Sequence, residues 1–116
     1  MPLRRSAFLL GALTALSACA PKTFYHWGNY EDIVYAGYVS PGKIDSDTQI
    51  AKLSEDIEQA RAQGKPVPPG VHAHLGYLYF LQGNPSAAQQ EFETEKSLFP
   101  ESAVFVDGLV QRMSRK

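Results

Sequence analysis

Two histidines with one residue between them, His72 and His74, have the spacing in this sequence that first suggests a metal site. Imidazole nitrogens are common zinc ligands, and two of them on one helix can share an ion when they are four residues apart. On a helix, residues two apart point about 200° away from each other. We therefore expect no metal site here, and we expect His74 to face a neighbouring residue or solvent.

Three glutamates, Glu91, Glu93 and Glu95, form an acidic cluster. Glu91 and Glu95 would lie four residues apart on a helix, where like charges repel mildly, so the cluster is interpreted as a solvated helix face. The sequence has no Gly-rich phosphate-binding loop, no nucleophile beside a general base, and no carboxylate pair expected in a cleft. These features predict a protein that is not an enzyme and that has no cofactor and no small-molecule substrate.

The N-terminal stretch has the layout of an export signal. Two arginines precede an apolar run over residues 7–16, which is too short to cross a membrane as a helix. Residues 16–19 read Leu-Ser-Ala-Cys and resemble the lipobox of bacterial lipoproteins. Cys19 is the only cysteine, so it cannot form an internal disulfide. The resemblance implies that residues 1–18 are a signal peptide and that Cys19 becomes the lipid-modified first residue.

The same resemblance implies a location on a membrane. A diacylglycerol and an amide-linked chain such as palmitate would exceed the two signals that stable anchoring needs. Ala20 stands where aspartate is the usual inner-membrane retention signal, so we expect the periplasmic face of the outer membrane. Without residues 1–18 the chain keeps nine of its 11 basic residues and all 12 acidic residues, a net charge of about −3. This balance argues against nucleic-acid binding.

Residues 19–43 form an aromatic-rich segment behind the expected lipid anchor. They hold the only tryptophan, Trp27, and four of the six tyrosines. Asn29 is a residue type that caps helices, and the apolar residues after it recur on one helical face, which predicts a short helix. Two interpretations stay open: these aromatics pack on the following helices, or they form a recognition surface.

Residues 44–116 are expected to form a helical domain. Asp45 precedes a helix that ends at Gly64, and residues 65–70 form a stiff, proline-rich connector. The turn at residues 83–85 combines a glycine, a capping asparagine and a proline at the first position of the next helix. The helix between Asp45 and Gly64 carries its apolar stripe on four residues: Ile50, Leu53, Ile57 and Ala60.

The stretch from Pro69 to Pro100 resembles one tetratricopeptide (TPR) repeat, a helix-turn-helix of about 34 residues. The pattern usually has tryptophan where His72 stands and alanine where Glu95 stands, so the packing should depart from the norm there. Six residues occupy the expected small, large apolar and helix-ending positions: Leu75, Gly76, Tyr79, Ala88, Phe92 and Pro100.

Helices on both sides extend this pattern. The helix that precedes residue 64 is at best a degenerate half repeat, and residues 101–113 resemble the first helix of a following repeat. The expected fold is therefore all-α: a minimal TPR-like array of one full repeat with flanking half repeats, preceded by the aromatic-rich segment.

Three stretches together point to a family: Tyr25 to Tyr30, Gly64 to Gly76 and Glu95 to Ser102. They resemble small proteobacterial TPR-containing outer-membrane lipoproteins of unassigned function, typically encoded beside a CsgG-like lipoprotein and a second small lipoprotein. The resemblance covers nearly all of the chain after Cys19. It implies co-assembly at the outer membrane, and it transfers no catalytic residues.

Outward positions of the first helix of a TPR repeat line its groove. Here they carry an apolar row, and a single full repeat leaves such a row uncovered. Either the aromatic segment folds over it through Trp27 and Tyr30, which is the arrangement we expect, or a partner occupies it. The groove positions are Ala73, Tyr77, Phe80 and Leu81, and the candidate partner-binding residues are Tyr77, Phe80, Leu81, Trp27 and Tyr35.

The leading hypothesis for function is a lipid-anchored scaffold that holds a protein partner in an envelope complex, with a CsgG-like lipoprotein as the partner that the resemblance implies. A pilotin-like factor that helps an outer-membrane oligomer assemble is one alternative. A regulator of a peptidoglycan-modifying enzyme, or a cryptic enzyme, is another.

Overall fold

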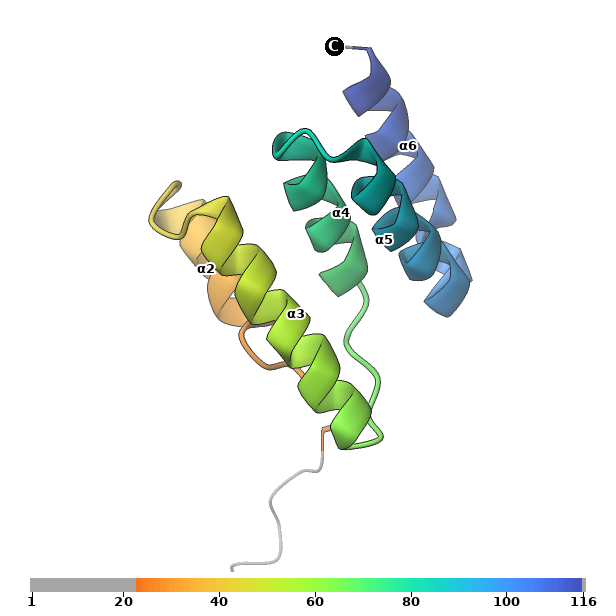
Figure 1. Cartoon of the computed structure of the whole chain (residues 1–116). Helices are drawn as coiled ribbons and strands as arrows, with labels where there is room; N and C mark the ends of the chain where they lie inside the picture. Colours follow the sequence, from red (N-terminus) through yellow and green to blue (C-terminus); the bar gives the residue numbers. More distant parts are fainter. Residues whose placement is uncertain (1–22, 116) are drawn as a thin grey trace, which may run out of the picture.

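The computed structural model describes residues 23–115, which form five α-helices and one 3-10 turn. Cys19 and the expected signal peptide lie outside the described residues. Figure 1 shows that successive helices alternate in direction, so that α2, α4 and α6 run one way and α3 and α5 run the other. The elements are α2 (Tyr30–Val39), α3 (Ser46–Ala62), α4 (Val71–Leu81), α5 (Pro85–Leu98), η2 (Pro100–Ser102) and α6 (Ala103–Ser114). The all-α class is confirmed.

Local signals fix the starts of α3 and α5 and the end of α4. The Asp45 side chain accepts a hydrogen bond from the Thr48 amide at 2.9 Å, and the Asn84 side chain accepts one from Ala87 at 3.1 Å. Both bonds satisfy amides that the first turn of a helix leaves free. Gly83 takes the left-handed conformation, with φ +75°, between α4 and α5. These ends agree with the prediction from sequence. No described helix is long and apolar enough to cross a membrane.

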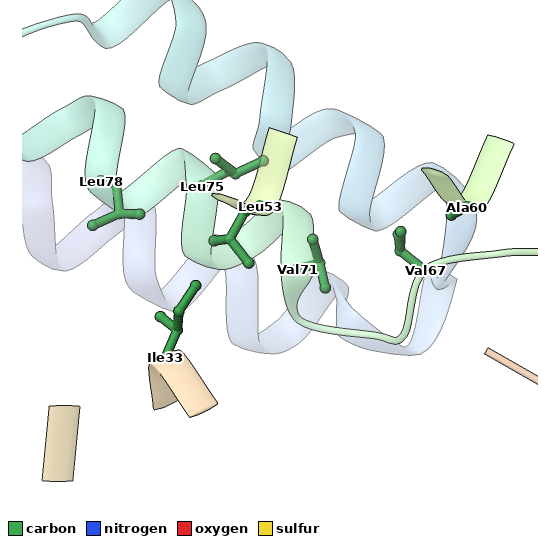
Figure 2. Packing of buried hydrophobic residues seen from close by; sticks show 7 residues of the cluster. All are labelled: Ile33, Leu53, Ala60, Val67, Val71, Leu75 and Leu78. Atoms are coloured by element: carbon green, nitrogen blue, oxygen red, sulfur yellow. The ribbon is translucent and has the colours of Figure 1, made fainter. Parts of the chain in front are cut away.

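One core cluster joins the first three helices and the connector before α4. In Figure 2, Leu53 of α3 lies among Leu75 and Val71 of α4 and Ile33 of α2. Val67 of the connector lies beside Ala60 near the end of α3. Burial of these side chains holds α2 and α3 against α4, because each fully buried large apolar side chain contributes about 1.5–3 kcal/mol.

A second cluster joins α4, α5 and α6 through Ala73, Ala88, Phe92 and Val106. Its closest approach is at Gly76. A Cβ atom at Gly76 would lie 2.5–2.9 Å from three carbons of the Phe92 ring, closer than packed carbon atoms come. Glycine at this position therefore lets α4 lie directly against the Phe92 ring of α5.

Candidate functional site

A buried carboxylate at the start of α2 replaces the cap expected from Asn29. The Asn29 side chain does not cap α2. Its amide nitrogen instead donates to Asp56 Oδ1 at 2.8 Å, and its backbone N–H donates to Asp56 Oδ2 at 2.7 Å. Asp56 is only 2% exposed. Gly28, with φ +51°, is required beside it because the Asp56 carboxyl fills the space of a Cβ. Asp56 therefore fastens the first turn of α2 to α3.

A second buried carboxylate, Glu95, corrects the interpretation of the acidic cluster. Glu95 is 1% exposed, so it does not belong to a solvated face. Its Oε1 accepts from the Gly70 amide at 2.7 Å and its Oε2 from the Ala73 amide at 3.3 Å. The Ser102 hydroxyl also lies 3.4 Å from Oε1. The positive end of the α4 dipole favours this charge, so Glu95 caps α4 from α5.

The two histidines contact different helices. His72 Nδ1 lies 2.6 Å from Glu91 Oε2 of α5, so Glu91 pairs with a histidine and is not part of a repulsive acidic face. His74 Nε2 lies 2.9 Å from Gln49 Oε1 of α3. In residues 23–115 no three His, Cys, Asp or Glu side chains come together as a metal site.

The candidate site is a groove along α4, between α2 and α6. One hollow, of about 490 Å³, lies between α2, the start of α3 and α4; another, of about 270 Å³, lies between α2, α4 and α6. His74 and Tyr77 line both hollows, so the two adjoin along this side of α4, and we call them together the groove. Its apolar and aromatic lining includes Tyr30, Ile33, Val34, Tyr38, Ala73, Tyr77, Leu81, Phe105 and Leu109.

Two polar groups that line the groove are neutral, His74 at its centre and Tyr30 nearer one end. Burial, and secondarily the charge of Glu95, raises the pKa of the Tyr30 hydroxyl, which keeps it protonated. Burial lowers the pKa of His74, which keeps the imidazole uncharged. Asp45 lies at the far end, near Tyr38, and hydrogen bonds from Thr48 lower the pKa of its carboxyl. The groove can therefore contact an apolar or aromatic surface without leaving a charge buried at its centre.

The structure places some of the predicted groove residues in the groove and others elsewhere. Tyr77 and Leu81 face the groove and are 40% and 55% exposed. Ala73 lines the groove but is buried against α5 and α6. Phe80 packs on the other side of α4, in a hollow between α5 and α6. The groove therefore keeps Tyr77 and Leu81 from the predicted row but not Phe80.

Trp27 does not cover the groove as expected. Its ring packs edge to face on Tyr25 at 6.2 Å, and Tyr25 packs on Phe99 at 6.3 Å. Phe24 adds a further edge contact to Tyr25 at 5.0 Å. We call Phe24, Tyr25 and Trp27 the aromatic ladder; it is exposed at the N-terminal side of α2. Tyr30 does reach the groove, while Tyr35 points to solvent and lines no part of it.

Sequence reasoning missed two groups of contributors to this site. Phe105 and Leu109 of α6 complete one wall; their spacing of four residues is a helical-face signal that could have placed them together. Asp56 and Glu95 orient α2 and α4 from within the fold. Each pairs with a segment more than 20 residues away, and no local pattern announces such a contact.

The pKa of His74 predicts a loss of stability in mild acid. Burial depresses it in the folded state, so the unfolded chain takes up the proton first as the pH falls below about 6.5. Stability from this group is complete above that pH and declines below it. We expect the melting temperature of wild type to fall by a few degrees from neutral to mildly acidic pH, and His74→Gln to fall less. Equal declines in both proteins would contradict the role of His74.

The described residues thus define a small all-helical protein of five α-helices with an apolar groove along α4. The chain belongs to the family described as Domain of unknown function (DUF4810), whose model matches residues 24–109. The match runs from the aromatic ladder through α2 to α5 and ends within α6, so the ladder and the groove both belong to the family's domain. No curated protein and no solved structure matches the sequence significantly.

Proposed function

We propose that this protein is a non-enzymatic scaffold that binds a protein partner in its groove, and that it does so on the periplasmic face of the outer membrane, anchored through lipid on Cys19. The observation that carries the proposal is the open groove centred on Tyr77. It is lined by aromatic and aliphatic side chains from three parallel helices. Apolar surface of this kind, rimmed by polar residues, commonly marks a protein interaction site.

The finer architecture that we propose is a TPR-like array. The alternating directions of α2 to α6 support it (Figure 1), as does the contact of Gly76 with Phe92, two residues at pattern positions. In such an array α2, α4 and α6 are the first helices of successive repeats, and those helices line the binding surface. The groove found between them lies where a TPR-like array would bind a partner.

The buried polar groups favour binding over catalysis. Asp56 and Glu95 accept hydrogen bonds from helix starts, and Glu91 pairs with His72. Each of these carboxylates therefore has a structural contact inside the fold. A CsgG-like lipoprotein remains the partner that the family resemblance implies.

The binding proposal is tested with the double variant Tyr77→Ala, Leu81→Ala. Both side chains are partly exposed, so we expect the helical circular dichroism to be retained. Affinity for the CsgG-like lipoprotein, measured by titration calorimetry, should fall by at least about 2 kcal/mol, roughly 30-fold, because aromatic anchors at the centre of an interface carry most of its energy. Co-purification from detergent-solubilised membranes should be lost in parallel.

Tyr35→Ala is the matched control, since Tyr35 is an exposed tyrosine on α2 outside the groove lining. We expect its affinity to stay within a few fold of wild type. Loss of binding in the control alone, or unchanged binding in the double variant, would show that the groove is not the docking surface.

A further inference from the structure

The aromatic ladder is an exposed apolar surface that the groove does not use. Phe24 is 74% exposed and Trp27 is 38% exposed. They sit on either side of Tyr25, which packs on Phe99 at the end of α5. Leu98, the residue before Phe99, is also exposed. Side chains of this size in contact with water are costly unless something covers them.

Hydrogen bonds fix the ladder at one end of the helical array. The His26 amide donates to the Pro66 carbonyl at 2.9 Å, and His26 Nδ1 lies 3.2 Å from Gln63 Oε1. Residues 63–66 follow the end of α3, and α5 also ends beside the ladder. The ladder therefore belongs to the end of the molecule where α2, α4 and α6 begin (Figure 1).

The short chain between Cys19 and the ladder limits their separation. Only residues 20–23 lie between Cys19 and Phe24. A fully extended chain spans at most about 3.6 Å per residue, so Phe24 lies within about 18 Å of Cys19. If Cys19 carries lipid chains that enter a bilayer, the ladder is held at the membrane surface.

We propose that the aromatic ladder rests in the interfacial layer of the membrane, so that the lipid anchor and the ladder together orient the protein. This inference rests on the lipid anchoring in the proposed function. Trp and Tyr rings favour the headgroup region, because one edge is apolar and the other can donate hydrogen bonds. Phe24 and Leu98 supply the apolar contact. Lys65, next to Pro66 and exposed, places a cation beside the ladder that suits anionic headgroups.

We call this placement of the aromatic ladder in the headgroup layer the membrane seat. It sets the direction of the groove relative to the membrane. Tyr30 and Gly70 line the groove near the ladder end, whereas Tyr38 and Leu81 line it at the opposite end. With the ladder in the headgroup layer, the groove rises from the membrane into the periplasm. A partner therefore reaches Leu81 from the aqueous side.

The exposure of aromatic side chains does not by itself identify which of them contact the membrane. Tyr35 and Tyr38 are as exposed as Phe24, but they follow it by at least 11 residues and lie toward the other end of α2. The distinction between them is the distance to Cys19. These two tyrosines therefore provide the matched control for the ladder.

The test uses the full lipidated protein in vesicles of phosphatidylethanolamine and phosphatidylglycerol, with or without bromine on the acyl chains. Trp27 is the only tryptophan, so its emission reports on the ladder alone. We expect emission at shorter wavelength on vesicles than in detergent-free buffer with the unlipidated chain, and a clear loss of intensity with brominated lipid. Phe24→Ser with Leu98→Ser should reduce that loss, whereas Tyr35→Ser with Tyr38→Ser should not. Circular dichroism verifies that each variant is folded.

The outcomes separate the seat from the anchor. A protein whose mass shows no diacylglycerol on Cys19 refutes both together. A lipidated protein with water-like, unquenched Trp27 emission overturns the seat and leaves the anchor intact. Shielding of Trp27 that appears only after the CsgG-like lipoprotein is added makes the ladder a protein interface and overturns the seat as well. Equal quenching in the ladder variant and the control variant also overturns the seat.

Discussion

Gly76→Leu is expected to prevent folding, and Gly76→Ala to destabilise the protein by about 1–3 kcal/mol, the range for overpacking of a tight core. The added Cβ would lie 2.5 Å from one Phe92 ring carbon and within 2.9 Å of two more. The Phe92 ring is buried among α4, α5 and α6, so it cannot turn away without disturbing all three helices. For a domain of this size the total stability is about 5–15 kcal/mol, and a leucine would remove most of it.

Gly108→Ala is the matched control, because Gly108 also lies inside a helix but a Cβ there meets no atom within 4 Å. Alanine should stabilise α6 by roughly 1 kcal/mol, since glycine is a poor helix former. Urea denaturation of the two alanine variants should therefore shift in opposite directions. Phe92→Ala should cost about 3–5 kcal/mol through the cavity that it leaves. Similar midpoints for Gly76→Ala and Gly108→Ala would disprove the close contact between α4 and α5.

The helices could be predicted because their signals are local. Asp45 and Asn84 cap helices through amides three residues ahead. Gly83 supplies the left-handed turn that ends α4. Each of these interactions is complete within a few residues, so the residue types and their spacing contain the whole physical reason. The short helix after Asn29 was also predicted, although Asn29 itself contacts Asp56 instead of capping it.

The buried carboxylates could not be predicted in the same way. Asp56 and Glu95 stand among other charged residues on amphipathic helices, where periodicity indicates a solvated face. Their partners come from distant parts of the chain: Asn29 for Asp56, and Gly70 with Ala73 for Glu95. Burial of these two charges depends on how the helices pack together, which the pattern of a single helix does not contain.

The groove was predicted in part for a geometric reason. Phe80 and Leu81 are adjacent on α4, so their side chains point about 100° apart. Leu81 enters the groove beside α2, whereas Phe80 packs toward α5 and α6. The assignment of both to one row failed because Phe80 packs, half-buried, in the hollow between α5 and α6. Tyr77, at the centre of the row, lies where the sequence placed it.

Coverage of the groove by the aromatic segment depended on the path of the chain before α2. The hydrogen bond from His26 to Pro66 draws that chain toward the connector, and Tyr25 packs on Phe99. Trp27 consequently lies beside Tyr25, away from Tyr77 and Leu81. Of the aromatic residues in this segment, Tyr30 and Tyr38, both on α2, reach the groove. The aromatic segment thus contributes to two surfaces, and composition alone could not divide it between them.

Glu95→Ala is the second substitution for which we expect a large loss of stability. It distinguishes the role of alanine at this position in the TPR pattern from the capping role of Glu95 in this structure. The TPR pattern has alanine there, so a fold that followed the pattern in every contact would tolerate the change or gain stability. In this structure the change leaves the partly buried amide of Gly70 and the buried amide of Ala73 without their acceptor. Each unsatisfied group costs about 1–3 kcal/mol. We therefore expect Glu95→Ala to lose roughly 3 kcal/mol and to fray the start of α4.

Glu95→Gln and Glu93→Ala make the test specific. Glutamine keeps one acceptor oxygen but loses the charge that the α4 dipole favours, so its stability should lie between wild type and Glu95→Ala. Glu93 is exposed and pairs with Lys96 on the surface, so Glu93→Ala should change stability by less than about 0.5 kcal/mol. Amide hydrogen exchange should accelerate at Gly70 and Ala73 in Glu95→Ala. Wild-type exchange at these two amides would mean that α4 begins without help from Glu95, and that alanine suffices here as in the TPR pattern.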